Sequence, residues 1–231
     1  MDKLERSPAR LVAHPNAPSA SDARFVEVAL TRLAKTSGDD LAEIKRAYEA
    51  ARTLPPNLRN NTSHVRGYTV EALGREELAR RFPGHHVDFG VEIRKGATDN
   101  VLGELDAIVI RDKDGQVAAM AEAKASPERM AGGLSKVRAH LARIQGSEVD
   151  HYQTRGEKKV WSFDDPEGPH HRSTFSKLGA GQCFAIGPSD APERADYIRL
   201  PISQASLGTI AELIVAQSRE ARTNVAQPLA A

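Results

Sequence analysis

GELDAIVIRDKDGQVAAMAEAKAS, residues 103–126, is the segment with the clearest structural pattern in this chain. Two apolar runs flank the turn-forming residues DKDG, 112–115, and this arrangement predicts an antiparallel hairpin. If a three-residue loop leaves residue 112 facing residue 116, Asp106 falls directly opposite Glu122. Loops of two or four residues shift this pairing by one position, so the alignment depends on the loop.

Lys124 joins the two carboxylates because side chains alternate along a strand, which puts Glu122 and Lys124 on one face. Two close carboxylates repel each other and favour a divalent cation with oxygen ligands, usually Mg²⁺. Such an ion polarises a phosphodiester and lowers the pKa of bound water, and an ammonium group stabilises charge on the scissile phosphate. E-x-K alone is a common pattern on solvated strands, so the prediction of a hydrolytic site rests on the pairing with Asp106.

Helix and strand patterns surround the hairpin on both sides. TVEALGREELARRF, residues 69–82, is rich in helix formers. Residues 128–145 predict an amphipathic helix whose outer face carries Lys136, and Gly132-Gly133 in this helix permits close packing or a bend. The remaining predicted elements are strands at 86–95 and 182–186 and a last helix around 207–216.

The first part of the chain has a different character. Residues 1–22 have little periodic apolar content, so we expect a flexible leader. Apolar residues at helical spacing predict a helical hairpin over residues 23–60, closed by Ser37-Gly38. PPNLRNNTS, residues 55–63, contains a double proline and turn-forming asparagines and marks the boundary. The chain then continues as one α/β domain over residues 61–231.

Composition restricts the classes of function. Lys and Arg total 32 against 31 Asp and Glu, a formal charge of +1, so affinity for a polyanion must come from local clusters of basic residues. Cys183 is the only cysteine, which excludes an internal disulfide and a multi-cysteine zinc site and predicts a reducing, cytoplasmic compartment. No run of about 18 apolar residues occurs, so no membrane partner is expected.

A resemblance to a known family follows from two short motifs. GELDAIV, residues 103–109, followed by MAEAKAS, residues 120–126, resembles the motif of the PD-(D/E)xK (restriction-endonuclease-like) nuclease superfamily, in which an Asp on one strand precedes E-x-K on the next. The resemblance implies an α/β fold with an αβββαβ core, whose mixed central sheet is flanked by helices. The Cys183 strand would complete this core, so residues 61–231 are expected to be the nuclease domain, preceded by the helical hairpin.

The same resemblance implies an activity and roles for individual residues. The activity is hydrolysis of DNA or RNA, with Asp106 and Glu122 holding Mg²⁺ or Mn²⁺ and Lys124 stabilising charge and positioning water. The family usually adds a glutamate from the first helix, and the match carries this role onto Glu76, with Glu71 as a competitor. On a helical wheel Glu71 projects toward the buried side and Glu76 lies on the flank, which leaves the choice open.

A basic and aromatic segment, HYQTRGEKKVWSF, residues 151–163, is a candidate nucleic-acid contact. Such a mixture can grip phosphates and stack on bases. It is equally compatible with a loop hairpin whose aromatic residues belong to the core. The predicted nucleic-acid-binding residues are Arg155, Lys158, Lys159 and Trp161.

The biological role is open between three hypotheses. The helical preamble and the free-standing compact domain resemble the nuclease tips of bacterial antagonism toxins, such as contact-dependent inhibition toxins and secreted effectors. That resemblance implies delivery into a target-cell cytoplasm and a cognate immunity protein as partner. The alternatives are a housekeeping repair or restriction endonuclease, and an inactive nuclease-fold module that binds nucleic acid or protein, in which the three charged residues only organise the sheet.

Overall fold

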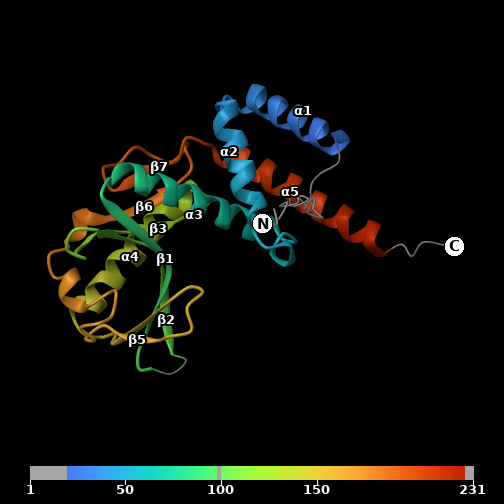
Figure 1. Cartoon of the computed structure of the whole chain (residues 1–231). Coiled ribbons are helices and arrows are strands. Elements are labelled where there is room, and N and C mark those ends of the chain that lie inside the picture. The colour runs from blue at the N-terminus through green and yellow to red at the C-terminus, as the bar shows by residue number, and fades with distance from the viewer. Residues whose placement is uncertain (1–19, 98–99, 227–231) are drawn as a thin grey trace, which may run out of the picture.

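A computed structural model describes residues 20–97 and 100–226 of the chain. These residues form five α-helices and one seven-stranded mixed sheet, so the fold is mixed α/β as predicted (Figure 1). The helices are α1 (Ala20–Ser37), α2 (Leu41–Arg52), α3 (Thr62–Arg81), α4 (Met130–Gln145) and α5 (Gln204–Ala226). Of these, α1, α2 and α5 lie together to one side of the sheet in Figure 1. The strands are β1 (His85–Arg94), β2 (Val101–Arg111), β3 (Val117–Ala123), β4 (His151–Thr154), β5 (Trp161–Ser162), β6 (Cys183–Gly187) and β7 (Tyr197–Arg199).

The sheet has the strand order β5-β4-β1-β2-β3-β6-β7. Its pairs are antiparallel from β5 to β3, whereas β3, β6 and β7 run parallel to one another. Strand β7 was not predicted, and β4 and β5 were predicted only as the alternative of a loop hairpin over residues 151–163. Strands β4, β5 and β7 have four, two and three residues, too few for an alternating pattern to be recognised. Because β3, β6 and β7 are parallel, the residues that follow them gather at one end of the sheet.

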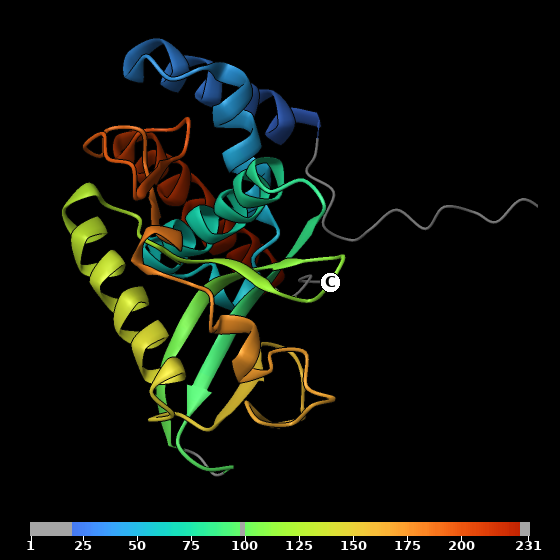
Figure 2. The same cartoon turned by 90° about the vertical axis from the view of Figure 1, so that its left-hand side faces the viewer.

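Two apolar clusters lie on opposite sides of the sheet. The first joins α1, α2, α3 and α5 to one face, with Leu30, Ile44, Leu73 and Ile210 among its buried members. The second joins α4 to the other face through Leu134, Val137 and Leu141. Figure 2 shows α4 lying along one side of the strands. The two N-terminal helices therefore share a core with the sheet. No helix in the described ranges is both long and apolar enough to span a membrane.

The predicted helices occur with altered ends. Helix α3 begins at Thr62, seven residues before the predicted start at Thr69, because the Asn61 side chain accepts a hydrogen bond from the Ser63 amide at 2.8 Å and caps the helix. Gly38 follows α1 with a φ of +79°, which ends the first helix where the hairpin turn was predicted. Residues 1–19 of the predicted leader lie outside the described residues.

The β2–β3 hairpin has the predicted register but a different loop. Ile110 pairs with Val117 and the Arg111 amide donates to the Gln116 carbonyl, so the loop is the four residues 112–115 and not the three residues that the alignment of Asp106 with Glu122 assumed. A bulge then leaves Ala118 without a partner, and Ala107 pairs with Ala121. The bulge offsets the longer loop, so continuing this register by one residue aligns Asp106 with Glu122.

Candidate active site

The structure brings Asp106, Glu122 and Lys124 together. Asp106 lies on β2, Glu122 lies near the end of β3, and Lys124 follows β3 directly. The Lys124 ammonium donates to Glu122 Oε1 at 2.6 Å, and the Ala123 amide donates to Asp106 Oδ2 at 2.7 Å. The E-x-K segment therefore contacts both carboxylates: its lysine binds one and its central backbone amide orients the other.

The Glu122 carboxylate is buried, with 1% of the residue exposed. Its Oε1 also accepts a hydrogen bond from the Lys136 ammonium at 2.6 Å, whereas its Oε2 has no hydrogen-bond partner among the described residues. Lys136 was expected on the outer face of its helix, and its side chain is 39% exposed, but its ammonium reaches inward to Glu122. A buried carboxylate oxygen without a partner is costly, so Oε2 is an acceptor available to a ligand.

Asp106 is held in an environment that favours its neutral form. Burial, and next the negative charge of Glu122, raise the pKa of Asp106 to about 7. Glu71 acts in the same direction, and the Ala123 amide and the Lys124 ammonium oppose it. A carboxylate that is unstable in its charged form, beside a second carboxylate, favours the binding of a cation.

A local twist in the β1–β2 pair shapes this end of the site. Phe89 pairs with Ala107 and Val91 with Leu105, so Gly90 lies opposite Asp106. Phe89 and Ala107 pack in the first apolar cluster, but Val91 and Leu105 pack in the second. In both strands, the residues that point to the first cluster therefore change from one alternating set to the other at Gly90 and Asp106. Gly90 has a φ of +61°, a conformation that residues with a Cβ rarely adopt.

Arg155 lies in the space above Gly90. A Cβ at position 90 would be 2.6 Å from Arg155 Nε, so only glycine allows this approach. The Arg155 guanidinium donates to Glu71 Oε2 at 3.0 Å and to Glu104 Oε1 at 2.5 Å. Arg155, which was predicted to bind nucleic acid, is therefore held over Gly90, the residue opposite Asp106, and is bound by two further carboxylates.

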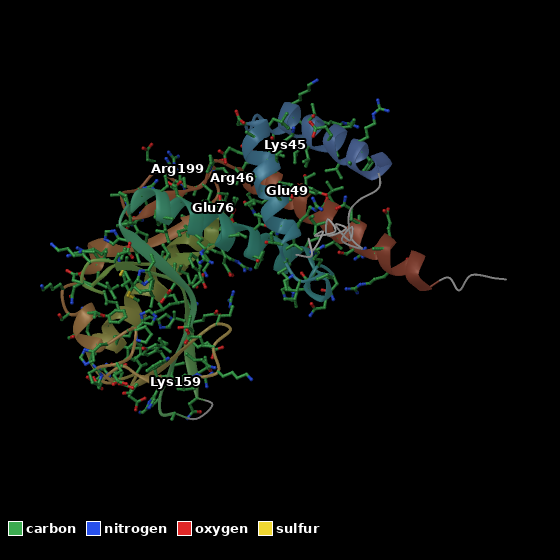
Figure 3. All side chains as sticks on the ribbon, viewed as in Figure 1. Lys45, Arg46, Glu49, Glu76, Lys159 and Arg199 are labelled. Carbon is green, nitrogen blue, oxygen red and sulfur yellow. The ribbon has the colours of Figure 1, made fainter. Side chains whose placement is uncertain are left out.

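The two candidate glutamates of α3 have different surroundings. Glu76 is exposed and forms an ion pair of 3.5 Å with Arg46 of α2, and Figure 3 shows both residues where α3 approaches α2. Glu71 contacts Arg155, and its charge contributes to the raised pKa of Asp106. The structure therefore brings Glu71 to the candidate site and does not bring Glu76 there, contrary to the residue preferred from the sequence.

The remaining predicted nucleic-acid contacts are apart from the carboxylates. Lys158 and Lys159 are exposed, and the Lys159 ammonium lies 3.1 Å from the centre of the half-buried Trp161 ring. Figure 3 places Lys159 at the opposite end of the sheet region from Glu76. Tyr152 and Phe163 are fully buried, as the alternative of core aromatics predicted. Lys159 thus occupies a face of Trp161 that a base would need for stacking.

Gly133 of α4 permits the close packing that the sequence suggested for the glycine pair. A Cβ at position 133 would be 2.9 Å from Lys124 Cγ and 3.3 Å from Glu122 Cγ. Its neighbour Gly132 has no atom within 4 Å of the same point. Gly133 thus lets α4 approach the site closely enough for Lys136 to reach Glu122.

Gly133→Ala should destabilise the protein by about 1–3 kcal/mol, because the added methyl group displaces the side chains of Lys124 and Glu122. Gly132→Ala is the matched control and should stabilise the protein by up to about 1 kcal/mol, since alanine favours a helix and the site is open. Urea unfolding measures both. Equal stabilisation by the two substitutions would show that the contact at residue 133 is unimportant.

The metal-binding capacity of the site depends on two carboxylates. In the described part of the chain, no three His, Cys, Asp or Glu residues are arranged to hold a metal ion. Mg²⁺, however, is commonly held by one or two carboxylates together with water and substrate oxygens. Asp106 and the partnerless Oε2 of Glu122 fit that requirement.

Comparisons of the chain with protein-family models, with curated proteins and with solved structures gave no match.

Proposed function

We propose that this protein hydrolyses phosphodiester bonds of nucleic acid with the help of a divalent cation, as a nuclease of the PD-(D/E)xK kind. The observation that carries the proposal is the pairing of Asp106, whose pKa is raised to about 7, with Glu122, whose buried Oε2 has no hydrogen-bond partner within residues 20–97 and 100–226. Two carboxylates of this kind beside a lysine are a set of groups suited to phosphoryl chemistry.

The arrangement of elements supports the same class. Helix α3, strands β1 to β3, helix α4 and strand β6 follow one another in the order expected for an αβββαβ core, with β4 and β5 inserted before β6. The carboxylates lie on β2 and β3, and the lysine lies two residues after the glutamate. Helices α1, α2 and α5 would then be additions packed on one face of that core.

Each residue of the site has a role in the proposed reaction. Asp106 and Glu122 would hold Mg²⁺ or Mn²⁺, and the bound cation would polarise the scissile phosphate and lower the pKa of water. The Ala123 amide keeps the Asp106 carboxylate oriented. The Lys124 ammonium stabilises negative charge that develops on the phosphate and positions the attacking water. Lys136 neutralises Glu122 from the side of α4.

The proposal is tested by incubating the purified protein with plasmid DNA and with total RNA, in Mg²⁺ or in EDTA, beside Asp106→Ala. We expect cleavage of at least one substrate that disappears in EDTA and in the variant. Cleavage that persists after both changes would refute the mechanism. Absence of cleavage of both substrates by the wild type in Mg²⁺ and in Mn²⁺ would refute the activity.

One observation favours a second candidate, an inactive module in which the charged residues stabilise the sheet. Glu122 Oε1 already accepts hydrogen bonds from two ammonium groups, so much of its charge is compensated without a cation. If stabilising the sheet is the whole role of the cluster, Glu122→Gln lowers the free energy of unfolding. The wild type then shows neither cation binding nor cleavage.

The α3 glutamates provide a further prediction under the proposed function. Glu71→Gln should lower the cleavage rate by about 10–100-fold, the range for groups that orient and tune a metal site, because Arg155 loses an anchor next to Asp106. Glu76→Gln should leave the rate unchanged, since the one ion pair of Glu76 in the described part of the chain is with Arg46 on the surface. Initial rates on the same substrate distinguish the two. A larger loss for Glu76→Gln would restore Glu76 as the site residue.

A further inference from the structure

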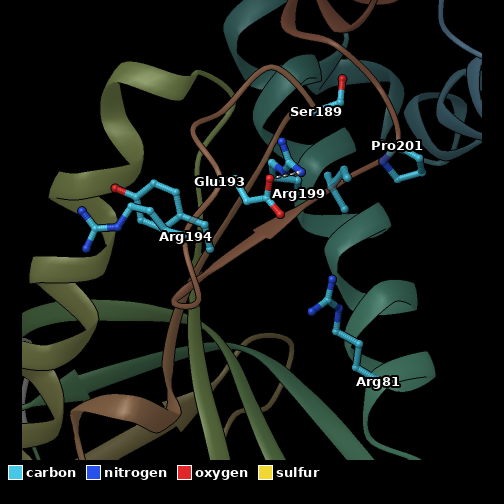
Figure 4. A pocket seen from close by; sticks show the side chains of 8 residues that line it. Arg81, Ser189, Glu193, Arg194, Arg199 and Pro201 are labelled. Atoms are coloured by element: carbon cyan, nitrogen blue, oxygen red, sulfur yellow. Dashed lines mark ion pairs between the residues drawn. The ribbon is translucent and has the colours of Figure 1, made fainter.

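A hollow of about 430 Å³ lies at the β7 edge of the sheet, apart from the carboxylates. Three arginines, Arg81, Arg194 and Arg199, and one acidic residue, Glu193, contribute charges to its lining. Figure 4 shows Arg81 extending from α3 toward the strand and loop that carry Arg199 and Ser189. Arginines from separate elements thus surround one open space, which gives it a positive potential.

Two of these arginines have guanidinium N–H groups that donate to no acceptor in the part of the protein that the structure describes. Arg81 donates to buried Glu77 through Nε at 2.6 Å, which leaves both its terminal amino groups without a protein acceptor in the described ranges. Arg199 has one ion pair there, a loose contact of 3.7 Å to Glu193, whose side chain is 86% exposed. Arg194 differs because Asp196 accepts from it at 2.9 and 3.0 Å. Planar guanidinium groups with free donors match the oxygens of a phosphate.

The part of the hollow formed by Ser189 and Arg199 lies at the same end of the sheet as the candidate site, whereas Arg81 reaches the hollow from the last turn of α3, which leads to the opposite end where His85 pairs with Arg111. Lys124 follows β3, Ser189 lies just beyond β6, and Pro201 lies just beyond β7. Ala123 pairs with Ile186 and the Lys124 amide donates to the Ile186 carbonyl, which aligns Lys124 with Gly187. Because Gly187 pairs with Arg199, Lys124 and Arg199 lie in the same row. With strands about 4.8 Å apart, two strand intervals separate β3 from β7 by about 10 Å. A backbone phosphate held in the hollow would therefore lie within a few nucleotides of the bond aligned with the carboxylates.

The geometry points to a second nucleic-acid contact in this hollow: Arg81, Arg199 and Ser189 bind a backbone phosphate a few nucleotides from the bond aligned with Asp106, Glu122 and Lys124. The inference rests on the proposed nuclease function. A nucleic-acid strand fits better than a buried small ligand because the two arginine side chains are 48% and 41% exposed and reach solvent. The contact is to the backbone, so it adds affinity without selecting a sequence.

The test measures binding of a fluorescently labelled oligonucleotide to the full chain in EDTA, where no cation-dependent cleavage occurs. Arg199→Gln and the double variant Arg81→Gln/Arg199→Gln remove the donors, while Arg80 continues to hold Glu77 at 2.6 Å. Losing one phosphate contact at about 0.1 M salt should weaken binding about fivefold to tenfold and flatten the logarithmic salt dependence by about 1. The loss should be equal for oligonucleotides of different sequence.

Arg111→Gln is the matched control. Arg111 is 47% exposed and ion-paired with Asp114, but it lies at the opposite end of β3 from Lys124. Binding by the double variant with wild-type affinity and salt dependence overturns the inference, and so does an equal loss in Arg111→Gln. A thermal shift by inorganic phosphate that needs Arg81 and Arg199, with oligonucleotide binding unchanged, also overturns it in favour of a small-phosphate site.

The outcomes for the two proposals are separable. If the wild type cleaves nucleic acid in Mg²⁺ but the double variant binds the oligonucleotide as the wild type does, only the proposal of a second contact is refuted. If the wild type does not cleave nucleic acid but its binding still depends on Arg81 and Arg199, the proposed nuclease activity is refuted. The hollow is then a nucleic-acid-binding surface of a protein without that activity.

Discussion

Lys124→Ala should reduce the rate of nucleic-acid cleavage by about 10²–10³-fold, the range for removing one group that stabilises charge in a transition state. The substitution removes the ammonium next to Glu122 and leaves both carboxylates in place. Glu122 keeps the Lys136 ammonium at 2.6 Å, so it is not left as an unpaired buried charge. The loss of rate should therefore occur in a protein that folds normally. Initial rates in Mg²⁺ and a urea unfolding curve test both statements.

Lys136→Ala is the control for this prediction. Lys124 and Lys136 contact the same Glu122 oxygen at the same distance, but Lys136 comes from α4 and not from the E-x-K segment. If Lys124 acts on the phosphate and Lys136 only neutralises Glu122, Lys136→Ala should cost about tenfold or less. If the Lys124→Ala variant cleaves at the wild-type rate, Lys124 has no role in the reaction.

The second large effect is on the pH dependence of stability without a cation. The pKa of Asp106 is about 7 in the folded protein against 3.8 for an ordinary Asp, so the folded state binds the extra proton between these values. The stability contributed by neutral Asp106 is fully present below about pH 4, decreases as the pH rises, and is lost above about pH 7. Three pKa units correspond to up to about 4 kcal/mol.

Asp106→Asn should abolish most of this pH dependence, because an amide does not titrate. In EDTA at about pH 8 the variant should be more stable than the wild type by up to about 4 kcal/mol, and the difference should vanish near pH 4. Asp114→Asn, in the exposed hairpin turn, is the control. Urea unfolding across this pH range measures the effect. Parallel stability curves for wild type and Asp106→Asn would show that Asp106 does not titrate near neutral pH.

The hairpin and the three charged residues were predictable because the information is local. Alternating apolar residues and DKDG define two strands, and the spacing of Glu122 and Lys124 sets their common face. The register at Ala107 and Ala121 was correct although the loop was not, since the bulge at Ala118 offset the additional loop residue. No sequence pattern distinguishes a three-residue loop from a four-residue loop with a bulge.

The residues that the sequence did not assign reach the site by tertiary packing. Lys136 approaches Glu122 because Gly133 lets α4 lie close to β3, and only the glycine pair hinted at such an approach. Arg155 was predicted as a nucleic-acid contact, but its position beside Glu71 follows from the positive φ of Gly90. Helical periodicity suggested that Glu71 projects inward, and the motif match pointed to Glu76. The periodicity agreed better with the structure.

The central claim is that Asp106 and Glu122 share one divalent cation, and Mn²⁺ titration followed by the electron paramagnetic resonance signal of free Mn²⁺ tests it most directly. At about pH 8, where Asp106 is ionised, the wild type and Asp114→Asn should each bind one Mn²⁺ that Mg²⁺ displaces. Asp106→Asn should lose that binding. Equal Mn²⁺ binding by the wild type and Asp106→Asn, or no binding by the wild type, would contradict the claim.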